Sequence, residues 1–390
     1  MPRLILSVNC AVYSVNLINQ HMKNARLKKR YPWLLTLFFL ACHSTSNNQP
    51  VATAEGFFKD AVLVSGLNHP WEITWGADGF IWMTEREGRI SRVDPGSGKV
   101  QLLLQENEVL AMGEGGMLGL ALHPDMKNHP EIFVAYNYKG NDGYREKIVK
   151  YTLRNNKLSD PKLIIDGINA SSIHNGCRLK IGPDGKLYIS TGDASNSSTA
   201  QDKNTLNGKI LRLNLDGTIP ADNPFPGNPV YSYGHRNAQG LVFHGSILYS
   251  SEHGPSNDDE INIIEKGRNY GWPAVEGFCD KNSERKFCQA NNIKEPIYAW
   301  TPTAAVCGLD YYTSDRIPGW KNSLLLVSLK NARLYQLELD NTGRSITSVK
   351  EFLKNKYGRL RDLCISPDGT VYISSSNGGN KDVIVKIAPK

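Results

Sequence analysis

The stretch PDGKLYISTG, residues 183–192, decides the fold because it joins a tight turn to a strand. Asp-Gly supplies the turn, since glycine adopts positive φ angles without steric cost, and the residues after it alternate as in a β-strand. The pattern returns in ADGFIWMTE at 77–85 and PDGTVYISSS at 367–376, and HGSILYSSEHG at 244–254 is a variant without the aspartate. The chain therefore repeats one strand–turn–strand unit.

These units lie near residues 78, 184, 246 and 368, with irregular gaps that fit structural repeats of roughly 40–60 residues. No helical heptad interrupts them. The pattern predicts an all-β fold, a six-bladed β-propeller over residues 57–390, and the alternative is a pair of β-sandwiches. In a propeller the loops of all blades meet at one end of the axis. Residues far apart in sequence can then line one pocket.

Charge is unevenly distributed along the chain. The 390 residues carry a formal net charge of +7, with 40% hydrophobic and 21% charged residues, which is an ordinary globular composition. Residues 1–42 contain six Lys and Arg and no acidic residue, so the rest of the chain is close to neutral. A near-neutral body argues against a nucleic-acid partner, whose phosphates require a basic surface. The sequence leaves open whether the protein is a monomer or a homodimer.

The N-terminal segment has the pattern of a targeting leader. A basic stretch precedes the apolar run 33–41, which is too short to span a bilayer but suits a signal peptide. Cys42 follows in FLAC, which resembles a bacterial lipobox, so we expect either lipid anchoring at Cys42 or plain secretion. Met22 is a plausible true start, and residues 43–56 form a polar tether. This predicts a periplasmic or cell-envelope location, with membrane contact only through a lipid anchor.

Five cysteines follow Cys42, and an oxidising compartment permits disulfides between them. Cys279 and Cys288 flank the polar loop CDKNSERKFC and are the expected pair. The alternative for every cysteine, including Cys177, Cys307 and Cys364, is a buried free thiol. No CxxC or Cys/His cluster indicates zinc or a redox motif.

Several polar residues sit beside the repeats, where a functional reading competes with a structural one. Glu114 is the one charged group in the glycine-dense GEGGMLGLALHPD, residues 113–125, and His174 lies in the loop before a strand. A lone histidine is more often structural. Arg359 and Arg361, at spacing two, share one face of a strand, either in solvent or as a fork that grips carboxylates.

An acidic segment follows at Asp258, Asp259 and Glu260, downstream of the Gly254–Pro255 step. Clustered carboxylates with free carbonyls suit a hard cation such as calcium. An exposed acidic turn is the alternative.

Taken together, these segments resemble the soluble aldose sugar dehydrogenases that use pyrroloquinoline quinone (PQQ). The likeness runs from LNHPWEITW at 67–75 to the C-terminus and includes AQDKNTLNGKILRLNLDGTIPADNPF at 200–225 and KGRNYGWP at 266–273. The resemblance implies a six-bladed propeller that oxidises aldoses at C1 to lactones with PQQ and Ca²⁺. The alternatives are a calcium-dependent propeller lactonase and a non-catalytic propeller that binds glycan or protein at the cell surface.

The resemblance assigns roles at matching positions. His174 takes the place of the catalytic base, and Arg236 and Asn237, in SYGHRNAQGLVF at 232–243, take the place of a pair that contacts the quinone. Further cofactor-binding cations implied in the same way are Lys330, Arg359 and Arg361. Main-chain carbonyls of Gly254 and Pro255 are implied calcium ligands, and a further calcium site is implied at Glu260 and Tyr270.

Three positions depart from the family pattern. Glu114, which also belongs to the implied cofactor-binding set, stands where the family usually has Gln, and an ionised carboxylate there would repel an anionic quinone. Ile173 stands where the soluble glucose dehydrogenase has Asp, so the partner that orients His174 must come from elsewhere. Cys177 replaces a common Gly. We expect sugar specificity in the loops 138–147 and 278–296, and the sequence names neither the sugar nor the electron acceptor.

Overall fold

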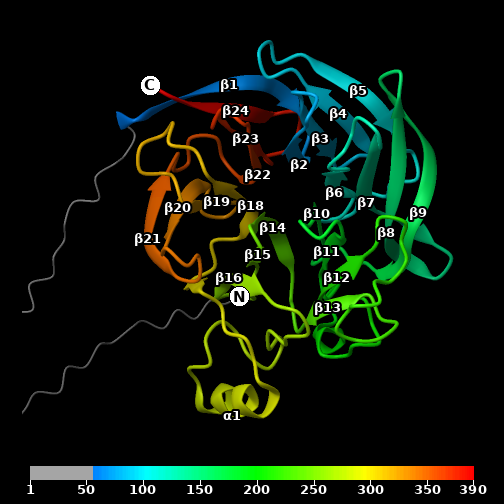
Figure 1. Cartoon of the computed structure of the whole chain (residues 1–390), viewed down its shortest axis with the longest axis vertical. Coiled ribbons are helices and arrows are strands. Elements are labelled where there is room, and N and C mark those ends of the chain that lie inside the picture. The colour runs from blue at the N-terminus through cyan, green and yellow to red at the C-terminus, as the bar shows by residue number, and fades with distance from the viewer. Residues whose placement is uncertain (1–55) are drawn as a thin grey trace, which may run out of the picture. The chain divides into compact units, whose positions relative to one another are not determined.

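The computed structural model describes residues 56–390, which form six four-stranded antiparallel sheets arranged around one axis (Figure 1). This confirms the predicted all-β six-bladed propeller and excludes the paired sandwiches. The blades are β2(Pro70–Trp75) to β5(Val100–Gln105), β6(Met117–Leu122) to β9(Lys157–Asn169), β10(Gly176–Ile181) to β13(Val230–Tyr233), β14(Ala238–His244) to β17(Tyr298–Trp300), β18(Val306–Tyr312) to β21(Ile346–Phe352), and β22(Leu360–Ile365) to β24(Asp382–Pro389) with β1(Phe58–Leu67).

The inner strands β2, β6, β10, β14, β18 and β22 surround the axis, and the remaining strands lie outside them. The strands between the first and last of each blade are β3(Ile81–Glu85), β4(Arg89–Val93), β7(Glu131–Gly140), β8(Gly143–Arg154), β11(Leu187–Thr191), β12(Lys209–Leu213), β15(Ile247–Glu252), β16(Asp259–Ile264), β19(Ser323–Ser328), β20(Arg333–Leu339) and β23(Val371–Ser375). A short 3-10 helix, η2(Ser197–Ala200), follows β11.

The ring closes where β1 pairs with β24, so the last blade combines the two ends of the described chain. Alternating apolar residues from neighbouring sheets interdigitate to form the core, in which Trp82, Trp320 and Phe133 are fully buried. Burying a large apolar side chain contributes roughly 1.5–3 kcal/mol, which makes this inter-sheet packing the main stabilisation of the ring.

The turn that predicted the fold is built in the same way in three blades. The amides of Gly79, Gly185 and Gly369 donate to carbonyls three residues earlier at 2.9–3.0 Å. All three glycines have φ of 69–80°, a region that favours glycine. The preceding aspartates accept hydrogen bonds from the amide two residues later at 3.1–3.3 Å, which holds each turn closed.

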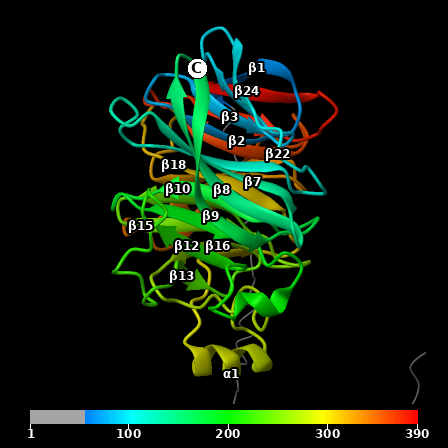
Figure 2. The same cartoon turned by 90° about the vertical axis from the view of Figure 1, so that its right-hand side faces the viewer.

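The polar loop between Cys279 and Cys288 is partly helical, which the sequence analysis did not predict. Helix α1(Asn282–Asn291) projects outside the ring (Figure 2). Glu284 accepts hydrogen bonds from the amide of Lys281 at 3.1 Å and from its ammonium at 2.9 Å, which caps the first turn. The predicted Cys279–Cys288 disulfide is confirmed. Cys177, Cys307 and Cys364 are buried free thiols.

The expected leader, with Met22 and Cys42, and nearly all of the expected tether lie outside the described residues. Within residues 56–390, no helix is long and apolar enough to cross a membrane.

Candidate functional site

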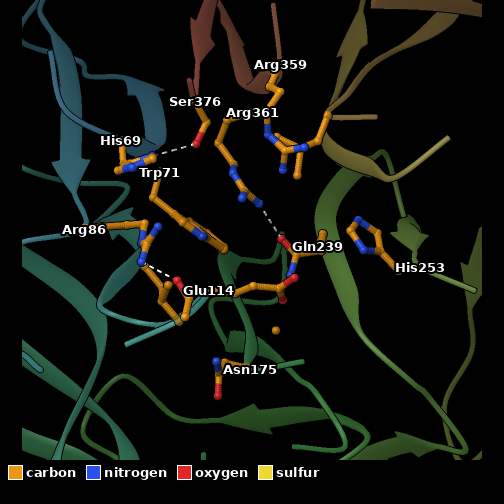
Figure 3. A pocket seen from close by; sticks show the side chains of 14 residues that line it. His69, Trp71, Arg86, Glu114, Asn175, Gln239, His253, Arg359, Arg361 and Ser376 are labelled. Atoms are coloured by element: carbon orange, nitrogen blue, oxygen red, sulfur yellow. Dashed lines mark hydrogen bonds between the residues drawn. The ribbon is translucent and has the colours of Figure 1, made fainter. Parts of the chain in front are cut away.

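A cavity of about 190 Å³ opens on the axis where the inner strands begin (Figure 3). It lies there because the residues that precede or start β2, β10 and β22 form its wall. Its lining consists of His69, Trp71, Arg86, Gly113, Glu114, Leu118, Asn175, Gly176, Gln239, His253, Leu329, Arg359, Arg361 and Ser376. We call it the axial cavity.

The inner strands deliver these side chains through a shared irregularity. In every blade the pairing of the inner strand with its neighbour shifts just after the first residue, as at Pro70 and Leu360. Such a bulge re-aims the next side chain. The second residues of β2, β14 and β22, which are Trp71, Gln239 and Arg361, line the axial cavity.

A buried ion cluster lies on the axis next to this cavity. Arg178 contacts the carboxylates of Glu72 and Asp362, the latter at 2.8 Å, and its Nε donates to the Gln239 carbonyl at 2.9 Å. Its guanidinium also lies 4.4 Å from the ring of Trp71. Burial raises the pKa of Glu72 to about 8. Because Arg178, Glu72 and Asp362 bond to one another, they position Trp71 and Gln239. The positive charge that lines the cavity comes from other side chains.

Arg359 and Arg361 both line the axial cavity, and Figure 3 shows them entering from the same side, although Arg359 precedes β22 and the strand pairing shifts at Arg361, so they do not share a regular strand face as predicted. Arg361 is only 8% exposed, its Nη1 donates to Gln239 Oε1 at 2.9 Å, and its Nε is buried without a partner in the described chain. Burial lowers the pKa of Arg361, but an arginine remains charged at neutral pH. A buried unpartnered donor is costly and indicates an acceptor that the polypeptide does not supply.

Glu114 also lines the axial cavity, and its loop is fixed by a residue that the sequence analysis did not single out. Arg86 donates from Nε to the Gly115 carbonyl at 3.2 Å and from Nη2 to the Gly113 carbonyl at 2.5 Å. The Glu114 carboxylate is exposed and accepts from the His174 amide at 3.2 Å. The carboxylate therefore faces the space that the arginines also face.

Asp193 is the partner that orients His174, a role that Ile173 cannot fill. Nδ1 of His174 lies 2.8 Å from Oδ1 of Asp193, whose side chain is only 2% exposed. The other oxygen of Asp193 accepts from Trp272 Nε1 at 2.9 Å. An ionised Asp193 fixes the proton on Nδ1 and leaves Nε2 of His174 as an acceptor. The backbone of His174 has a φ of 59°, so the surrounding loops hold a residue in an unfavourable region.

Arg236 lies next to this pair. Its guanidinium sits 5.4 Å from the Trp272 ring, its carbonyl accepts from the Asp193 amide at 2.8 Å, and its Nη1 donates to the His253 carbonyl at 3.1 Å. Its Nε is buried without a partner in residues 56–390. Burial lowers the pKa of Arg236, and the nearby Asp193 and Glu252 oppose that shift.

Asn237 is fully buried between the loops that carry the site. Its Oδ1 accepts from the Gly176 amide at 3.0 Å and from Gln239 Nε2 at 3.2 Å. Its Nδ2 has no acceptor among the described residues. Asn237 therefore ties the His174 loop to β14 and keeps two free donor hydrogens.

A second, smaller cavity of about 10 Å³ adjoins the first, and His253 lines both. Space for about one water-sized probe suits a single ion or water. The residues implied at two separate calcium sites, Gly254 with Pro255 and Glu260 with Tyr270, all line this one cavity. Arg236, Glu252, Asp258 and Glu276 also do so. We call it the carboxylate cavity.

Its electrostatics favour a cation. Burial, and then the neighbouring Glu252, raise the pKa of Glu260 to about 8, which indicates too little positive charge around the carboxylate. Burial followed by the field of Arg361 lowers the pKa of His253 to about 3, so this ring is neutral. Asp259 does not join this set, because its carboxylate accepts from the amides of Gly254 and Ala304 at 2.8 Å. The hydroxyl of Tyr270 is bonded to Ile263 and Glu265, which leaves its backbone carbonyl as a ligand atom.

Of the predicted site residues, the axial cavity is lined by Glu114, Arg359 and Arg361, and the carboxylate cavity by Arg236, Gly254, Pro255, Glu260 and Tyr270, whereas His174, Asn237 and Lys330 line neither. Lys330 is exposed, and its ammonium lies 3.1 Å from Thr303 Oγ1, although its neighbour Leu329 lines the axial cavity. Lys330 itself lines neither cavity, so its predicted cofactor contact stays a prediction.

Sequence reasoning missed Trp71, Arg86, Asp193, Gln239 and His253. A signal was present for two of them. Aligning the inner strands PWEITW, GCRLKI, AQGLVFH and LRDLCI at their bulges places Trp71, Gln239 and Arg361 at one position. Asp193 follows the PDGKLYISTG unit directly, but only the fold shows that its carboxylate meets His174.

Comparisons with known proteins agree with this geometry. Residues 67–385 match the family described as glucose/sorbosone dehydrogenase. The quinoprotein glucose dehydrogenase B of Acinetobacter calcoaceticus is 35% identical over 421 residues, which covers 84% of this chain and 87% of that protein. The PQQ-bound aldose sugar dehydrogenase of Streptomyces coelicolor is 32% identical with a TM-score of 0.74, covering 85% and 98% of the two chains. The apo-form of the soluble aldose sugar dehydrogenase of Escherichia coli is 31% identical with a TM-score of 0.78, covering 85% and 100%.

Proposed function

This chain belongs to the glucose/sorbosone dehydrogenase family, and we propose that it is a PQQ-dependent, Ca²⁺-assisted enzyme that oxidises aldose sugars at C1 to lactones. The observation that carries the proposal is the set of unpartnered buried nitrogens at the two cavities. They are Arg361 Nε at the axial cavity and Arg236 Nε at the carboxylate cavity, together with Asn237 Nδ2 beside the axial-cavity residues Gly176 and Gln239. A cofactor with three carboxylates and an ortho-quinone supplies acceptors of the kind that such donors need.

The residues present fit that cofactor. Arg359 and Arg361 would hold carboxylates from one side of the axial cavity, and the flat ring of Trp71 lines the same space. Arg236, from the adjoining carboxylate cavity, and Asn237, beside Gly176 and Gln239, would hold polar groups of the cofactor. Lys330 would reach the cofactor by leaving Thr303, which a flexible exposed side chain permits.

The carboxylate cavity fits Ca²⁺. The carbonyls of Gly254, Pro255 and Tyr270 and the carboxylate of Glu260 are the oxygen ligands that this ion prefers. A bound cation would also favour the ionised form of Glu260, whose pKa burial otherwise raises to about 8.

The chain's own residues would divide the remaining work. The chemistry that PQQ supplies when bound is acceptance of a hydride from C1 of the sugar. Nε2 of His174 takes the proton of the C1 hydroxyl, because Asp193 holds the proton on Nδ1. Asp193 also stabilises the imidazolium that forms. Arg236 and the cation of the carboxylate cavity place positive charge beside the axial cavity, where negative charge develops during reduction.

For location, we propose that the protein acts in the periplasm or cell envelope, exported through the leader expected in residues 1–42. The Cys279–Cys288 disulfide supports an oxidising compartment. The electron acceptor would be an external carrier that reaches the open end of the axial cavity.

The test is reconstitution of the purified chain with PQQ and Ca²⁺, followed by aldose oxidation with an artificial electron acceptor. The proposal predicts activity that requires both additions, and a His174→Ala variant that binds PQQ without turnover. Absence of both quinone binding and activity on every aldose would overturn it. Lactone hydrolysis by the quinone-free, Ca²⁺-loaded protein would instead establish a lactonase.

A further inference from the structure

A second cluster of metal-ligating side chains lies outside both cavities, in the turn between β6 and β7. Nitrogen atoms of His123 and His129 and a carboxylate oxygen of Glu131 all lie within 4.8 Å of one another. The three residues follow an H-x5-H-x-E spacing, with His123 directly after β6 and Glu131 at the start of β7. We propose that they bind a divalent transition-metal ion of the Zn²⁺ class, and we call them the β6–β7 turn site.

The backbone of the turn preorganises this arrangement. The amide of His123 donates to the Glu131 carbonyl at 2.9 Å, so these two residues face each other across the hairpin. The amide of His129 donates to the Asp125 carbonyl at 2.8 Å, which folds the loop back onto its base. The two imidazole rings lie 4.7 Å apart between centroids. Local hydrogen bonds thus bring the ligand atoms together without any metal.

The three ligand atoms need to move only a short distance toward one another to bind zinc. Tetrahedral zinc with bonds of about 2.0–2.1 Å separates its ligand atoms by roughly 3.3 Å. The turn site must therefore close by at most about 1.5 Å, which the exposed side chain of His129 can supply by rotation. Two interactions oppose closure. Lys150 lies 2.8 Å from Glu131, and Nδ1 of His123 accepts from the Asp125 amide at 3.1 Å, so ligation through Nε2 requires a tautomer change.

The donor set selects the metal. Two imidazoles and one carboxylate suit Zn²⁺, Co²⁺, Ni²⁺ or Cu²⁺, whereas Ca²⁺ prefers oxygen ligands, which are the atoms implied as calcium ligands in the carboxylate cavity. Three protein ligands leave one position of a tetrahedral ion open to water or to a partner's side chain. The turn site also lies apart from the cofactor region, because His123 lines a different cavity, with Trp75 and Ile181, where the inner strands end.

Cobalt absorption tests this directly. The full chain, loaded with Ca²⁺ to fill its oxygen sites, is titrated with Co²⁺ while the visible d–d bands are recorded, and with Zn²⁺ by calorimetry. We expect bands typical of a low-coordinate site and a Zn²⁺ affinity at least tenfold weaker in His129→Ala. Glu131→Gln should weaken binding similarly. Lys150→Gln should tighten it, because the competing ammonium is removed.

Lys127→Gln is the matched control, since it removes a charge from the same exposed loop without removing a ligand. Equal cobalt bands and Zn²⁺ affinity in wild type and His129→Ala would overturn the proposal, and so would a Lys150→Gln variant that binds no tighter than wild type. Neither readout depends on dehydrogenase activity.

Discussion

Replacing Asp193 by Asn tests the proposed base most sharply, because it removes one charge and preserves the side-chain shape. Asp193 lies 2.8 Å from His174 Nδ1 and is almost fully buried, so solvent does not screen the pair. With about 4 Å between the charge centres and an effective dielectric constant of about 20, the attraction between the carboxylate and the imidazolium is about 4 kcal/mol. Losing it lowers the rate by about 10³-fold.

The assay is single-turnover reduction of the reconstituted enzyme with an aldose, beside a PQQ binding titration of the same variant. We expect Asp193→Asn to lose about 10³-fold in the reductive step with nearly unchanged cofactor affinity. Asp315→Asn serves as the control, because that carboxylate is exposed and pairs only with Lys321. A reductive rate within tenfold of wild type would refute the role of Asp193 as the group that orients and stabilises the base.

Four further predictions concern the cavities. Arg361→Gln should weaken PQQ binding by about tenfold to a hundredfold, since a charged hydrogen bond is worth about 1.5–3 kcal/mol, and an unchanged dissociation constant in an absorbance titration would count against the arginine's role. Glu114→Gln should tighten PQQ binding about fivefold, because it removes a negative charge beside an anionic cofactor, and weaker binding would contradict that reasoning. Ca²⁺ affinity measured by calorimetry should fall as pH drops below about 8, the value to which burial raises the pKa of Glu260, and Glu260→Gln should abolish this dependence. The raised pKa also means that the folded, metal-free chain binds the proton more tightly than the unfolded chain, so chemical denaturation of the metal-free protein should show stability falling as pH rises from about 4.5 to about 8.

The fold could be predicted from the sequence because the residues that form its repeated turn lie close together in the chain. Asp184 and Gly185 make their turn with atoms only a few residues away, and the same chemistry recurs at Asp368 and Gly369. The ring closure between β1 and β24 is a long-range pairing, and the sequence reading gave no sign of it. Helix α1 was missed because its cap uses Glu284 and Lys281, a pairing that also suits an exposed loop.

The site could be predicted only in part, for a related reason. Arg359 and Arg361 share one cavity, but Arg359 precedes β22 and the pairing shifts at Arg361, so the spacing on a regular strand was not the reason. The contact between Asp193 and His174 lies just beyond the Gly176–Thr191 pair of the β10–β11 hairpin, so the turn at Asp184 and Gly185 brings the two residues near each other, but the sequence does not show the register shift after Gly176. Lys330 shows a second limit of prediction from sequence. Its match to a family motif gives the residue type, but it does not give the direction of a long exposed side chain.

The most direct measurement of the central claim is a titration of PQQ into the metal-loaded apoprotein, followed by absorbance. The claim is that unpartnered donors at the axial and carboxylate cavities, Arg361 Nε and Arg236 Nε, await an anionic cofactor. It predicts saturable one-to-one binding that weakens in Arg361→Gln and tightens in Glu114→Gln. Binding that neither substitution alters, or no spectral change at any PQQ concentration, would contradict it.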